Sequence, residues 1–488
     1  MIRHLMHVEF DRQRGLQEQV RESLISAILS GLFPPDSPLP SCRQLASQLH
    51  VSRNTTALVF EGLVSEGYLI SRPRSGYYLH PDYHLTPPSA AQDLLIHDET
   101  APSWSTRMKI SPSQQESILK PAGWKNYRYP FIYGQPDTRQ FPIASWRATA
   151  NWLHGGVRDP AWVVDHIDQD VPMLIEQIRT RVLPKRGIAA SPDEILITLG
   201  SQNALYLLTR LLMNRETRVA VEDPGFREAI NTFLLSETAI VPHPLDNEGI
   251  KLNDAAACDY YYVTPGHQVP TGVTMSQARR QQLLAHAVRH DAVIIEDDYD
   301  SESNFTLNPL PALKASDRSG RVIYVSSLSK ALSPGLRLGF MVADPDLIDE
   351  ARALRRLMYR HPPTNIQYQM AHFLAQGHYE THLRRYHDDS ARRWDRLHDA
   401  LRTSLPECNM MAGSEHANAF WLSTPQHIST RQLTWRAAHA GVLIEPGARH
   451  FLGDAPPDHF FRMGFHAIDP QAIAPGVDVL KGQLMQMG

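Results

Sequence analysis

The stretch VIYVSSLSKALSPGLRLGF, residues 322–340, contains a lysine whose place in the sequence is not typical of an ordinary surface lysine. Its first four residues are β-branched or aromatic, which predicts a buried strand. Ser327, Ser329 and Lys330 follow this strand, and a Pro-Gly break then leads to Arg337. A lysine held just beyond a strand can lose its proton and attack an aldehyde, and the neighbouring hydroxyls and guanidinium suit a phosphate. Taken alone, the stretch also fits an ordinary exposed lysine.

A second stretch lies upstream, AVIIEDDYD at residues 292–300, where three acids arrive at the end of another apolar run. Open α/β sheets bind their ligands beyond the carboxyl ends of the strands. Asp297 at such a place can keep a pyridine nitrogen protonated, and Tyr299 can donate to the phenolic oxygen of the same ring. A metal cluster or a solvated loop is the alternative for this stretch alone.

Together and in this order, the two stretches resemble the pyridoxal-phosphate enzymes of aminotransferase fold type I. TLGSQNA, residues 198–204, is similar to the phosphate cup of that family. Gly200 permits close backbone approach, and the amides of Ser201 and Gln202 open a helix towards the phosphate. The resemblance implies pyridoxal 5'-phosphate as the cofactor and Lys330 as the lysine that forms its Schiff base.

Other motifs of the same resemblance imply further site residues. Phe226 in EDPGF corresponds to the aromatic residue stacked on the cofactor ring, and His267 and Gln268 in GHQVPTG correspond to the turn beside its phenolic oxygen. Arg462 in FRMGF and the backbone of Gly134 in GQPD are implied to bind the ligand's carboxylate. For Arg462 an internal salt bridge is the alternative, because an arginine among apolar neighbours needs an anionic partner.

Strand-length apolar runs alternate with helical patterns through the middle of the chain, which predicts a mostly parallel, helix-covered sheet. The predicted strands are residues 195–198, 219–221, 260–263, 293–295 and 322–325. Residues 344–405 are helical in pattern. Three later strands, residues 415–422, 441–445 and 460–465, predict a small α+β subdomain with a turn at Pro446-Gly447.

The first eighty residues predict three helices. Apolar residues recur every four positions from residue 16 to near Gly31, which indicates an amphipathic helix. Ser41 with Gln44 forms a capping box that opens a second helix. Ser52 caps a third helix over residues 53–66, and Gly67 ends it. Two short strands around a basic turn follow, at residues 68–70 and 77–79.

Three helices and a two-stranded wing form a winged helix-turn-helix, whose third helix enters a major groove of double-stranded DNA. The charge of residues 1–80 is only +1, so DNA affinity depends on local clustering of arginines. A protein-interaction module of the same geometry is the alternative. The residues expected to contact DNA are Arg43, Ser52, Arg53, Asn54, Thr55, Arg72, Arg74 and Gly76.

This N-terminal region closely resembles the DNA-binding domain of the GntR regulators, and its fusion to an aminotransferase-like domain is the layout of the MocR subfamily. The expected fold is a mainly α winged helix-turn-helix followed by an α/β fold type I domain with a smaller α+β C-terminal subdomain. The expected boundaries are 1–81 for the DNA-binding domain, 82–129 for a linker and 130–488 for the effector domain. Within the effector domain we expect a large subdomain at about 155–342 and a small one made of about 343–488 plus the entry segment near Gly134.

Two positions depart from the family pattern. Relatives usually carry a tyrosine and a Gly/Pro-rich turn where this chain reads DHIDQD, residues 165–170. That tyrosine commonly reaches the phosphate held by the neighbouring subunit, so its absence bears on the inter-subunit phosphate contact. Phe226 also replaces a frequent tyrosine, which retains ring stacking and removes a hydroxyl.

Composition is that of an ordinary globular protein: 488 residues, 42% hydrophobic, with a formal net charge of −4. No apolar run approaches the ~20 residues needed to span a membrane, and the N-terminus lacks a signal peptide's apolar core, so we expect a cytoplasmic protein. Cys42, Cys258 and Cys408 are widely spaced and predict free thiols. No metal site is expected.

Two functions remain open from the sequence. The first is a transcriptional regulator whose effector, an amino acid, an amine metabolite or the vitamer itself, displaces Lys330 as an external aldimine. The resemblance implies a head-to-tail homodimer, in which a linker of about fifty residues lets each DNA-binding domain cross to the other subunit. The alternative is a metabolic aminotransferase with an accessory N-terminal domain, and a residual half-transamination stays possible in either case.

Overall fold

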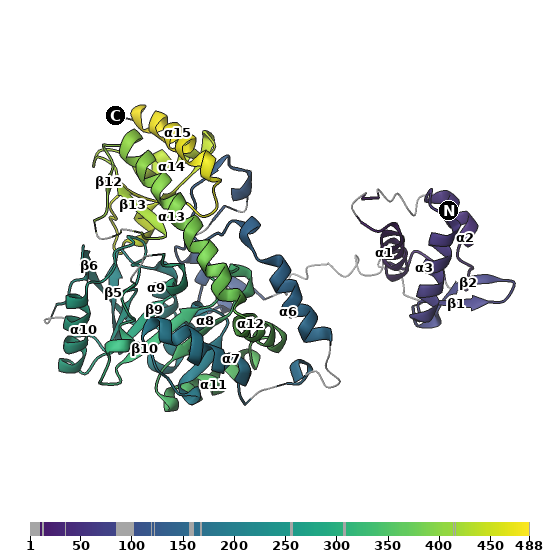
Figure 1. Ribbon diagram of the computed structural model, residues 1–488, viewed down its shortest axis with the longest axis horizontal. Coiled ribbons are helices and arrows are strands. Elements are labelled where there is room, and N and C mark those ends of the chain that lie inside the picture. Colours follow the sequence, from purple (N-terminus) through teal and green to yellow (C-terminus); the bar gives the residue numbers. More distant parts are fainter. Residues whose placement is uncertain are drawn as a thin grey trace. The chain divides into compact units, whose positions relative to one another are not determined.

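The computed structural model describes residues 10–11, 14–34, 36–83, 102–118, 120–121, 123–155, 161–165, 168–253, 257–305, 309–412, 414 and 416–487. The chain divides into two compact units, Met1–Lys109 and Ile110–Gly488 (Figure 1). The second unit begins inside the segment expected to be a linker, and Gln115 and Ile118 of that segment form hydrogen bonds with Asn231 and Glu228 of the larger domain. None of the described helices is long and apolar enough to cross a bilayer.

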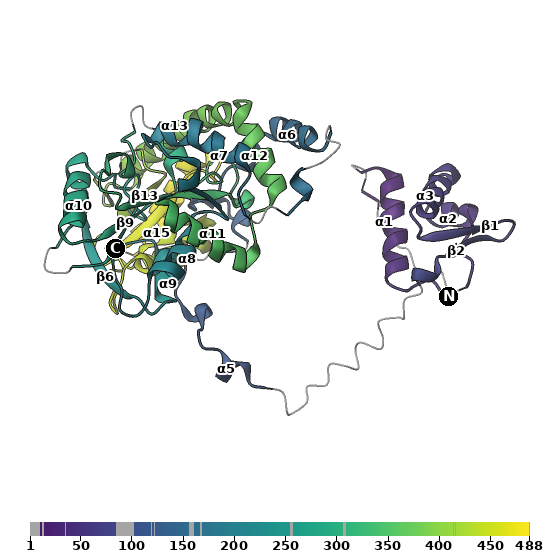
Figure 2. The ribbon, with the colours of Figure 1, turned by 90° about the horizontal axis from the view of Figure 1, so that it is seen from below.

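The first unit has the three helices and the wing expected from the sequence (Figure 2). Ser41 and Gln44 form the predicted capping box, and the Ser52 hydroxyl accepts a hydrogen bond from the Thr55 amide at 3.1 Å. Phe60 and Leu63 lie fully buried in the core that the three helices share. The elements are α1 Leu16–Leu29, α2 Cys42–Gln48, α3 Arg53–Ser65, β1 Leu69–Arg72 and β2 Gly76–Leu79.

An eight-stranded sheet in the order β4-β11-β10-β9-β8-β5-β6-β7 forms the centre of the second unit. The strands β10, β9, β8, β5 and β6 run parallel to one another, whereas β11 is antiparallel to both of its neighbours. The mostly parallel sheet is therefore confirmed. The strands are β4 Ile195–Thr198, β5 Arg218–Asp223, β6 Ala239–Asp246, β7 Gly249–Ile250, β8 Tyr260–Val263, β9 Val293–Asp298, β10 Val322–Ser327 and β11 Gly339–Val342.

Helices cover both faces of this sheet, so its central strands are apolar on both sides. Two consecutive residues of β10, which point to opposite faces of the sheet, show this directly. Tyr324 packs in one core with α7, α12 and part of α13, whereas Val325 packs in another with α8, α9 and α11. The helices are α6 Ile143–Gly155, α7 Pro172–Gln177, α8 Ser201–Leu212, α9 Arg227–Leu234, α10 Gln277–Arg289, α11 Pro345–Tyr359, α12 Thr364–Ala375 and α13 His378–Ser404.

A smaller four-stranded sheet, β12-β13-β16-β15, forms the C-terminal subdomain. Helices α14 Thr430–His439 and α15 Ile473–Met485 lie near it in Figure 1. The strands are β12 Asn409–Met410, β13 Ala419–Ser423, β15 Glu445–Pro446 and β16 Phe460–Gly464; a separate parallel pair joins β3 Tyr129–Pro130 to β14 Val442–Leu443.

Two local predictions in this subdomain were wrong. The strand expected to begin at residue 415 begins at Ala419, because the amide of Ala417 closes a turn on the carbonyl of Ser414 at 3.1 Å. The turn expected at Pro446-Gly447 is instead the end of β15 followed by a 3-10 turn, Gly447–His450. Residue 415 itself lies outside the described residues.

The 27-residue helix α13 belongs to both subdomains, as Figure 1 shows. Near its start, Tyr379, Leu383 and Tyr386 pack in the core that contains β10 and β11. Near its end, Leu397 and Leu401 pack in the core of the small subdomain. One continuous helix therefore connects the two hydrophobic cores.

Candidate functional site

A cavity of about 320 Å³ lies where the carboxyl ends of the parallel strands meet the small subdomain. This is the place at which open α/β sheets bind ligands. Its walls come from the large sheet, from the small subdomain and from residues that precede both. The residues that line it are Ile118, Lys120, Tyr133, Gly134, Gln135, Ser201, Gln202, Phe226, Glu228, Val269, Tyr299, Ser327, Lys330, Pro334, Arg337, Glu445 and Arg462.

Lys330 presents its amine inside this cavity. Its Nζ donates to the Tyr133 hydroxyl at 2.8 Å and lies 4.6 Å from the centre of the Tyr299 ring. Burial lowers the pKa of Lys330 to about 8; the carboxylate of Asp300 opposes this effect and the charge of Arg462 adds to it. About a tenth of the amine is therefore neutral and nucleophilic at pH 7, far more than for an ordinary lysine.

Asp297, on β9, does not line the cavity but lies close enough to Lys330 to act on its charge, and one of its carboxylate oxygens has no partner among the described residues. Tyr262 donates to Oδ2 at 2.9 Å, whereas Oδ1 is buried and accepts no hydrogen bond from the part of the chain that the structure describes. Burial raises the pKa of Asp297 to about 7. A buried acceptor of this kind needs a donor, and the ring nitrogen of pyridoxal phosphate in its protonated form supplies one.

The predicted phosphate cup is assembled around Gly200. This residue has φ +81°, and a Cβ on it would lie 2.9 Å from Nη2 of Arg337. Arg337 itself adopts a left-handed conformation, φ 50°, and donates to the carbonyl of Leu199 at 3.0 Å. Ser201 and Gln202 open the twelve-residue helix α8, whose first amides have no partner within the helix. Free amides, a guanidinium and the hydroxyl of the adjacent Ser327 fit a phosphate group.

Ser329, also predicted as a cofactor contact, does not line the cavity. Its hydroxyl accepts from the amide of Leu338 at 2.7 Å and donates to the carbonyl of the same residue at 2.9 Å. The Ser329 amide in turn donates to the Ser327 hydroxyl at 3.2 Å. Ser329 therefore fixes the loop that carries Lys330, while Ser327 faces the cavity.

The turn of the GHQVPTG motif differs from expectation. Gln268 directs its amide to the carbonyl of Pro224 at 2.8 Å, and His267 directs Nδ1 to Asp300 at 3.4 Å. Neither side chain lines the cavity, which Val269 lines instead. Tyr299 does line it, and its hydroxyl donates to the carbonyl of His267 at 3.0 Å.

Arg462, on β16, lies buried against the cavity and already has an anionic neighbour. Its Nη1 is 3.6 Å from Oε1 of Glu445, and its guanidinium lies 3.5 Å from the centre of the Tyr133 ring. Burial opposes the ionisation of Glu445, but a hydrogen bond from His450 at 2.9 Å and the charge of Arg462 lower its pKa to about 2. Arg462 thus both faces the ligand space and forms the internal ion pair that was the alternative.

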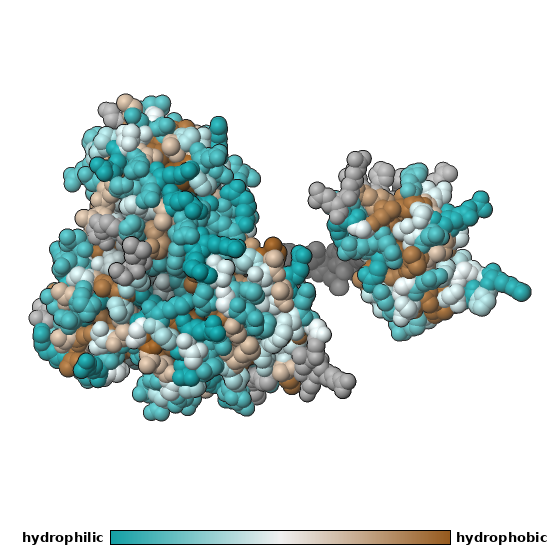
Figure 3. Space-filling view, viewed as in Figure 1, coloured by the Kyte–Doolittle hydropathy of each residue, from teal (hydrophilic) through white to brown (hydrophobic). Residues whose placement is uncertain are grey.

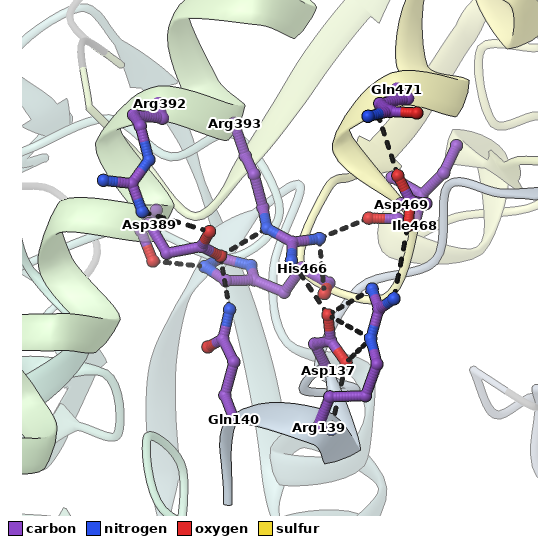
Figure 4. Close-up of polar contacts among 11 residues, drawn as sticks. Asp137, Arg139, Gln140, Asp389, Arg392, Arg393, His466, Ile468, Asp469 and Gln471 are labelled. Atoms are coloured by element: carbon purple, nitrogen blue, oxygen red, sulfur yellow. Dashed lines mark hydrogen bonds and ion pairs between the residues drawn. The ribbon is translucent and has the colours of Figure 1, made fainter.

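A polar network fixes the opening segment that carries Tyr133 and Gly134 (Figure 4). Arg393 of α13 donates to Asp137 at 2.9 Å, and Arg139 donates to the same carboxylate at 2.7 Å. The hydrogen bonds from Arg139 lower the pKa of Asp137 to about 2. At the other end of the segment, the amide of Gly464 donates to the carbonyl of residue 131 at 3.1 Å. The cavity wall is therefore held between β16 and α13.

The acidic stretch that replaces the family tyrosine has internal partners. Asp165 accepts from Nε2 of His361 at 2.8 Å. Asp170 is buried, accepts from Arg355 at 2.7 Å and from the amide of Ile197 at 3.1 Å. These contacts tie Asp170 to β4 and α11, and Asp165 to the residues that follow α11.

The cavity contains residues that the sequence did not reveal. Tyr133 directly precedes the predicted Gly134, and its aromatic character beside a glycine was an available signal. Glu445 is the last residue of a predicted strand. Ile118 and Lys120 lie in a segment without periodicity, which carried no local signal.

In the DNA-binding unit, Ser52 caps α3 and the exposed residues Arg53 and Asn54 occupy its first turn. The wing is a tight hairpin in which Arg72 stacks over the Tyr78 ring at 4.1 Å, and its protruding tip is hydrophilic in Figure 3. The remaining predicted contacts, exposed or partly exposed, are Arg43, Thr55, Arg74 and Gly76.

Comparison with known proteins gives the family. The profile of aminotransferase class I and II matches residues 167–477, and that of the bacterial regulatory proteins of the gntR family matches residues 16–79. The HTH-type transcriptional regulator TauR of Rhodobacter capsulatus is 35% identical over 473 residues, 95% of this chain and 96% of TauR. The probable rhizopine catabolism regulatory protein MocR of Rhizobium meliloti is 30% identical over 503 residues, 99% and 96%.

Among solved structures, a kynurenine aminotransferase of Pyrococcus horikoshii superposes with a TM-score of 0.71 at 26% identity, covering 81% of this chain and 99% of the other. The match supports the fold type I architecture of the second unit. The chain belongs to the MocR subfamily of GntR transcriptional regulators, in which a helix-turn-helix domain is joined to an aminotransferase-like domain.

Proposed function

We propose that this protein is a DNA-binding regulator that holds pyridoxal 5'-phosphate and senses an amine through aldimine exchange at Lys330. The observation that carries the proposal is the buried pair formed by Lys330, in the cavity wall, and Asp297 near it. The Lys330 amine has a pKa of about 8, and Oδ1 of Asp297 lacks a donor among the described residues. A pyridoxal aldehyde and its ring nitrogen answer both requirements.

The surrounding residues supply the remaining contacts of the cofactor. The amides of Ser201 and Gln202, the Ser327 hydroxyl and the Arg337 guanidinium would hold the phosphate, and Phe226 would stack on the ring. Gly200 allows the close backbone approach. When bound, the cofactor supplies an aldehyde carbon and an electron-withdrawing ring.

The effector is an amino acid, an amine metabolite or the vitamer itself. Its amine would take the place of the Lys330 amine, and its carboxylate would lie between Arg462 and the backbone of Gly134. Because Lys330 is released only when an amine arrives, the two states differ in contacts, and such a difference is what shifts a conformational equilibrium.

The output is binding to a double-stranded DNA operator in the cytoplasm. Arg53, Asn54 and Thr55 on α3 would read the major groove, while Arg43, Arg72 and Arg74 would contact the backbone. A head-to-tail homodimer would present two such units. Two half-sites about one helical turn (~34 Å) or a multiple apart are then expected.

An absorbance spectrum of the purified protein, repeated during titration with amino acids and simple amines, tests the proposal. We expect a near-visible band that one class of amine shifts and that is absent in Lys330→Ala but present in the exposed control Lys251→Ala. No band after addition of pyridoxal phosphate, or a band that persists in Lys330→Ala, would refute the Schiff-base assignment. Release of an oxo acid at every turnover would identify an enzyme instead.

A further inference from the structure

The segment that precedes β3 and leads back to the DNA-binding unit forms part of the cavity wall. The side chain of Gln115 donates to the carbonyl of Asn231 at 3.2 Å, and the amide of Ile118 donates to Glu228 at 2.9 Å. Both partners belong to α9, which carries the segment alongside the cavity. Ile118 and Lys120 then line the cavity itself.

Lys120 brings a second amine to the ligand space, where the nearby carboxylates of Glu445 and Glu228 act on it only through their charge. Within the described parts of the chain its amine has no hydrogen-bond or ion-pair partner. Arg462, by contrast, is paired with Glu445, which His450 also holds ionised. Burial of the Lys120 amine lowers its pKa, so an anionic ligand group would also restore its preference for the charged form. Four basic side chains line the cavity, against two carboxylates, so a negative ligand group beside Lys120 is favourable; the basic residues are Lys120, Lys330, Arg337 and Arg462, and the acidic ones Glu228 and Glu445.

The position of Lys120 lets one small ligand reach both amines. A point at the Cβ position of Gly134 lies 3.2 Å from Nζ of Lys120 and 3.9 Å from Nζ of Lys330. The two amines are therefore within about 7 Å of each other, and both lie close to Gly134. A short molecule whose amine is at Lys330 can place an acidic group at Lys120.

We propose that Lys120, together with Arg462, binds the acidic group of the amine ligand, and that the ligand thereby fixes the segment leading to the DNA-binding unit. This inference rests on the proposed sensing function and names its ligand class: amines that carry a carboxylate or another acid. Neutral amines enter the same site without engaging Lys120. The segment that contacts the ligand's charge, through Lys120, is thus the one that continues into the DNA-binding unit.

The test uses stable reduced conjugates, which need no catalytic chemistry. Full-length, cofactor-free protein is titrated with the phosphopyridoxyl conjugates of glycine and β-alanine and with those of the matching alcohols, ethanolamine and 3-aminopropanol. Lys120→Met should weaken the better-binding acid conjugate about tenfold or more, as expected for a hydrogen bond to a charged group, and leave its alcohol counterpart within about twofold. Lys125→Met, an exposed lysine nearby in the same segment, is the matched control.

Hydrogen exchange of residues 110–121 provides the second readout. In the wild type the acid conjugate should slow exchange in this segment more than the alcohol conjugate does, and Lys120→Met should abolish the difference. Equal weakening of acid and alcohol conjugates, or no weakening, overturns the inference. If the wild type forms a Schiff-base band and Lys120→Met retains full affinity for the acid conjugate, only the role of Lys120 fails; if no band forms, the sensing function fails.

Discussion

Asp297→Asn is expected to stabilise the cofactor-free protein against unfolding and to lower its affinity for pyridoxal phosphate. In the folded protein without cofactor, burial raises the pKa of Asp297 from an ordinary 3.8 to about 7. The folded state therefore binds more protons than the unfolded state between these values, and stability falls as the pH rises from about 4 to 7. Above pH 7 the buried carboxylate is ionised, and the folded protein bears the full loss of stability. Asparagine has no charge to bury, so the variant avoids this loss.

The size of the effect follows from the two pKa values. Their difference corresponds to about 4 kcal/mol at pH 8, which is an upper bound because asparagine also loses the strong hydrogen bond from Tyr262. For a unit of about 380 residues, an unfolding entropy of about 2.1 cal/mol/K per residue converts this into a rise of up to about 5 °C in the midpoint. Pyridoxal phosphate should bind about ten- to hundredfold more weakly, because a charged hydrogen bond contributes about 1.5–3 kcal/mol.

Scanning calorimetry of the cofactor-free protein at pH 5.5 and 8, with a spectrophotometric cofactor titration, measures both effects. The pH-dependent loss of stability should be smaller in Asp297→Asn than in the wild type. Asp349→Asn, an exposed position on α11, should change neither quantity. A lower midpoint for Asp297→Asn at pH 8, or wild-type affinity for the cofactor, would show that the unpartnered oxygen is not what we infer.

Three further perturbations test other parts of the chain. Arg53→Ala should weaken binding to an operator obtained by selection in vitro by about 1–3 kcal/mol in a mobility-shift assay, while the exposed Arg318→Ala leaves it unchanged. Ser52→Ala removes the cap of α3 and should destabilise the DNA-binding unit by about 1 kcal/mol, seen as a lower midpoint of its calorimetric transition. Gly464→Ala places a Cβ 2.3 Å from a backbone carbonyl oxygen and should disrupt the small subdomain. Gly482→Ala, with open space around it, should be neutral or stabilise the protein by up to about 1 kcal/mol. An equal response of the two variants in thermal unfolding would contradict the packing argument.

The sequence predicted those elements whose signal is local. The strands at Ile195–Thr198 and Tyr260–Val263 matched their predicted bounds, because each is a short run of mostly buried, β-branched or aromatic residues. The capping serines were equally readable. β9, in contrast, continues through its three acids to Asp298. Acidic residues are disfavoured in strands, so the predicted strand ended at residue 295. The strand continues because tertiary partners satisfy these acids: Glu296 accepts from the amide of Leu313 at 2.7 Å, and Asp298 accepts from Arg186 at 2.8 Å.

The cavity shows the same limit. Motif positions indicated Lys330 and Arg337 because their neighbours in the chain define the loop. Val269 replaces Gln268 at the wall, since the direction of a side chain within a turn depends on which carbonyl it reaches. Lys120 lies more than 200 residues from Lys330 and meets it only through the packing of its segment on α9, so no pattern in the sequence could have indicated it.

The continuity of α13 restricts how the length of this protein can change in evolution or by design. An extra residue inserted between its two packed halves would turn everything beyond it by about 100° and move it by about 1.5 Å. Leu397 and Leu401 would then leave their core while Tyr379 and Leu383 kept theirs. Homologues and engineered variants should therefore tolerate insertions at helix ends and loops and preserve the residue count between Tyr386 and Leu397, whatever ligand they bind.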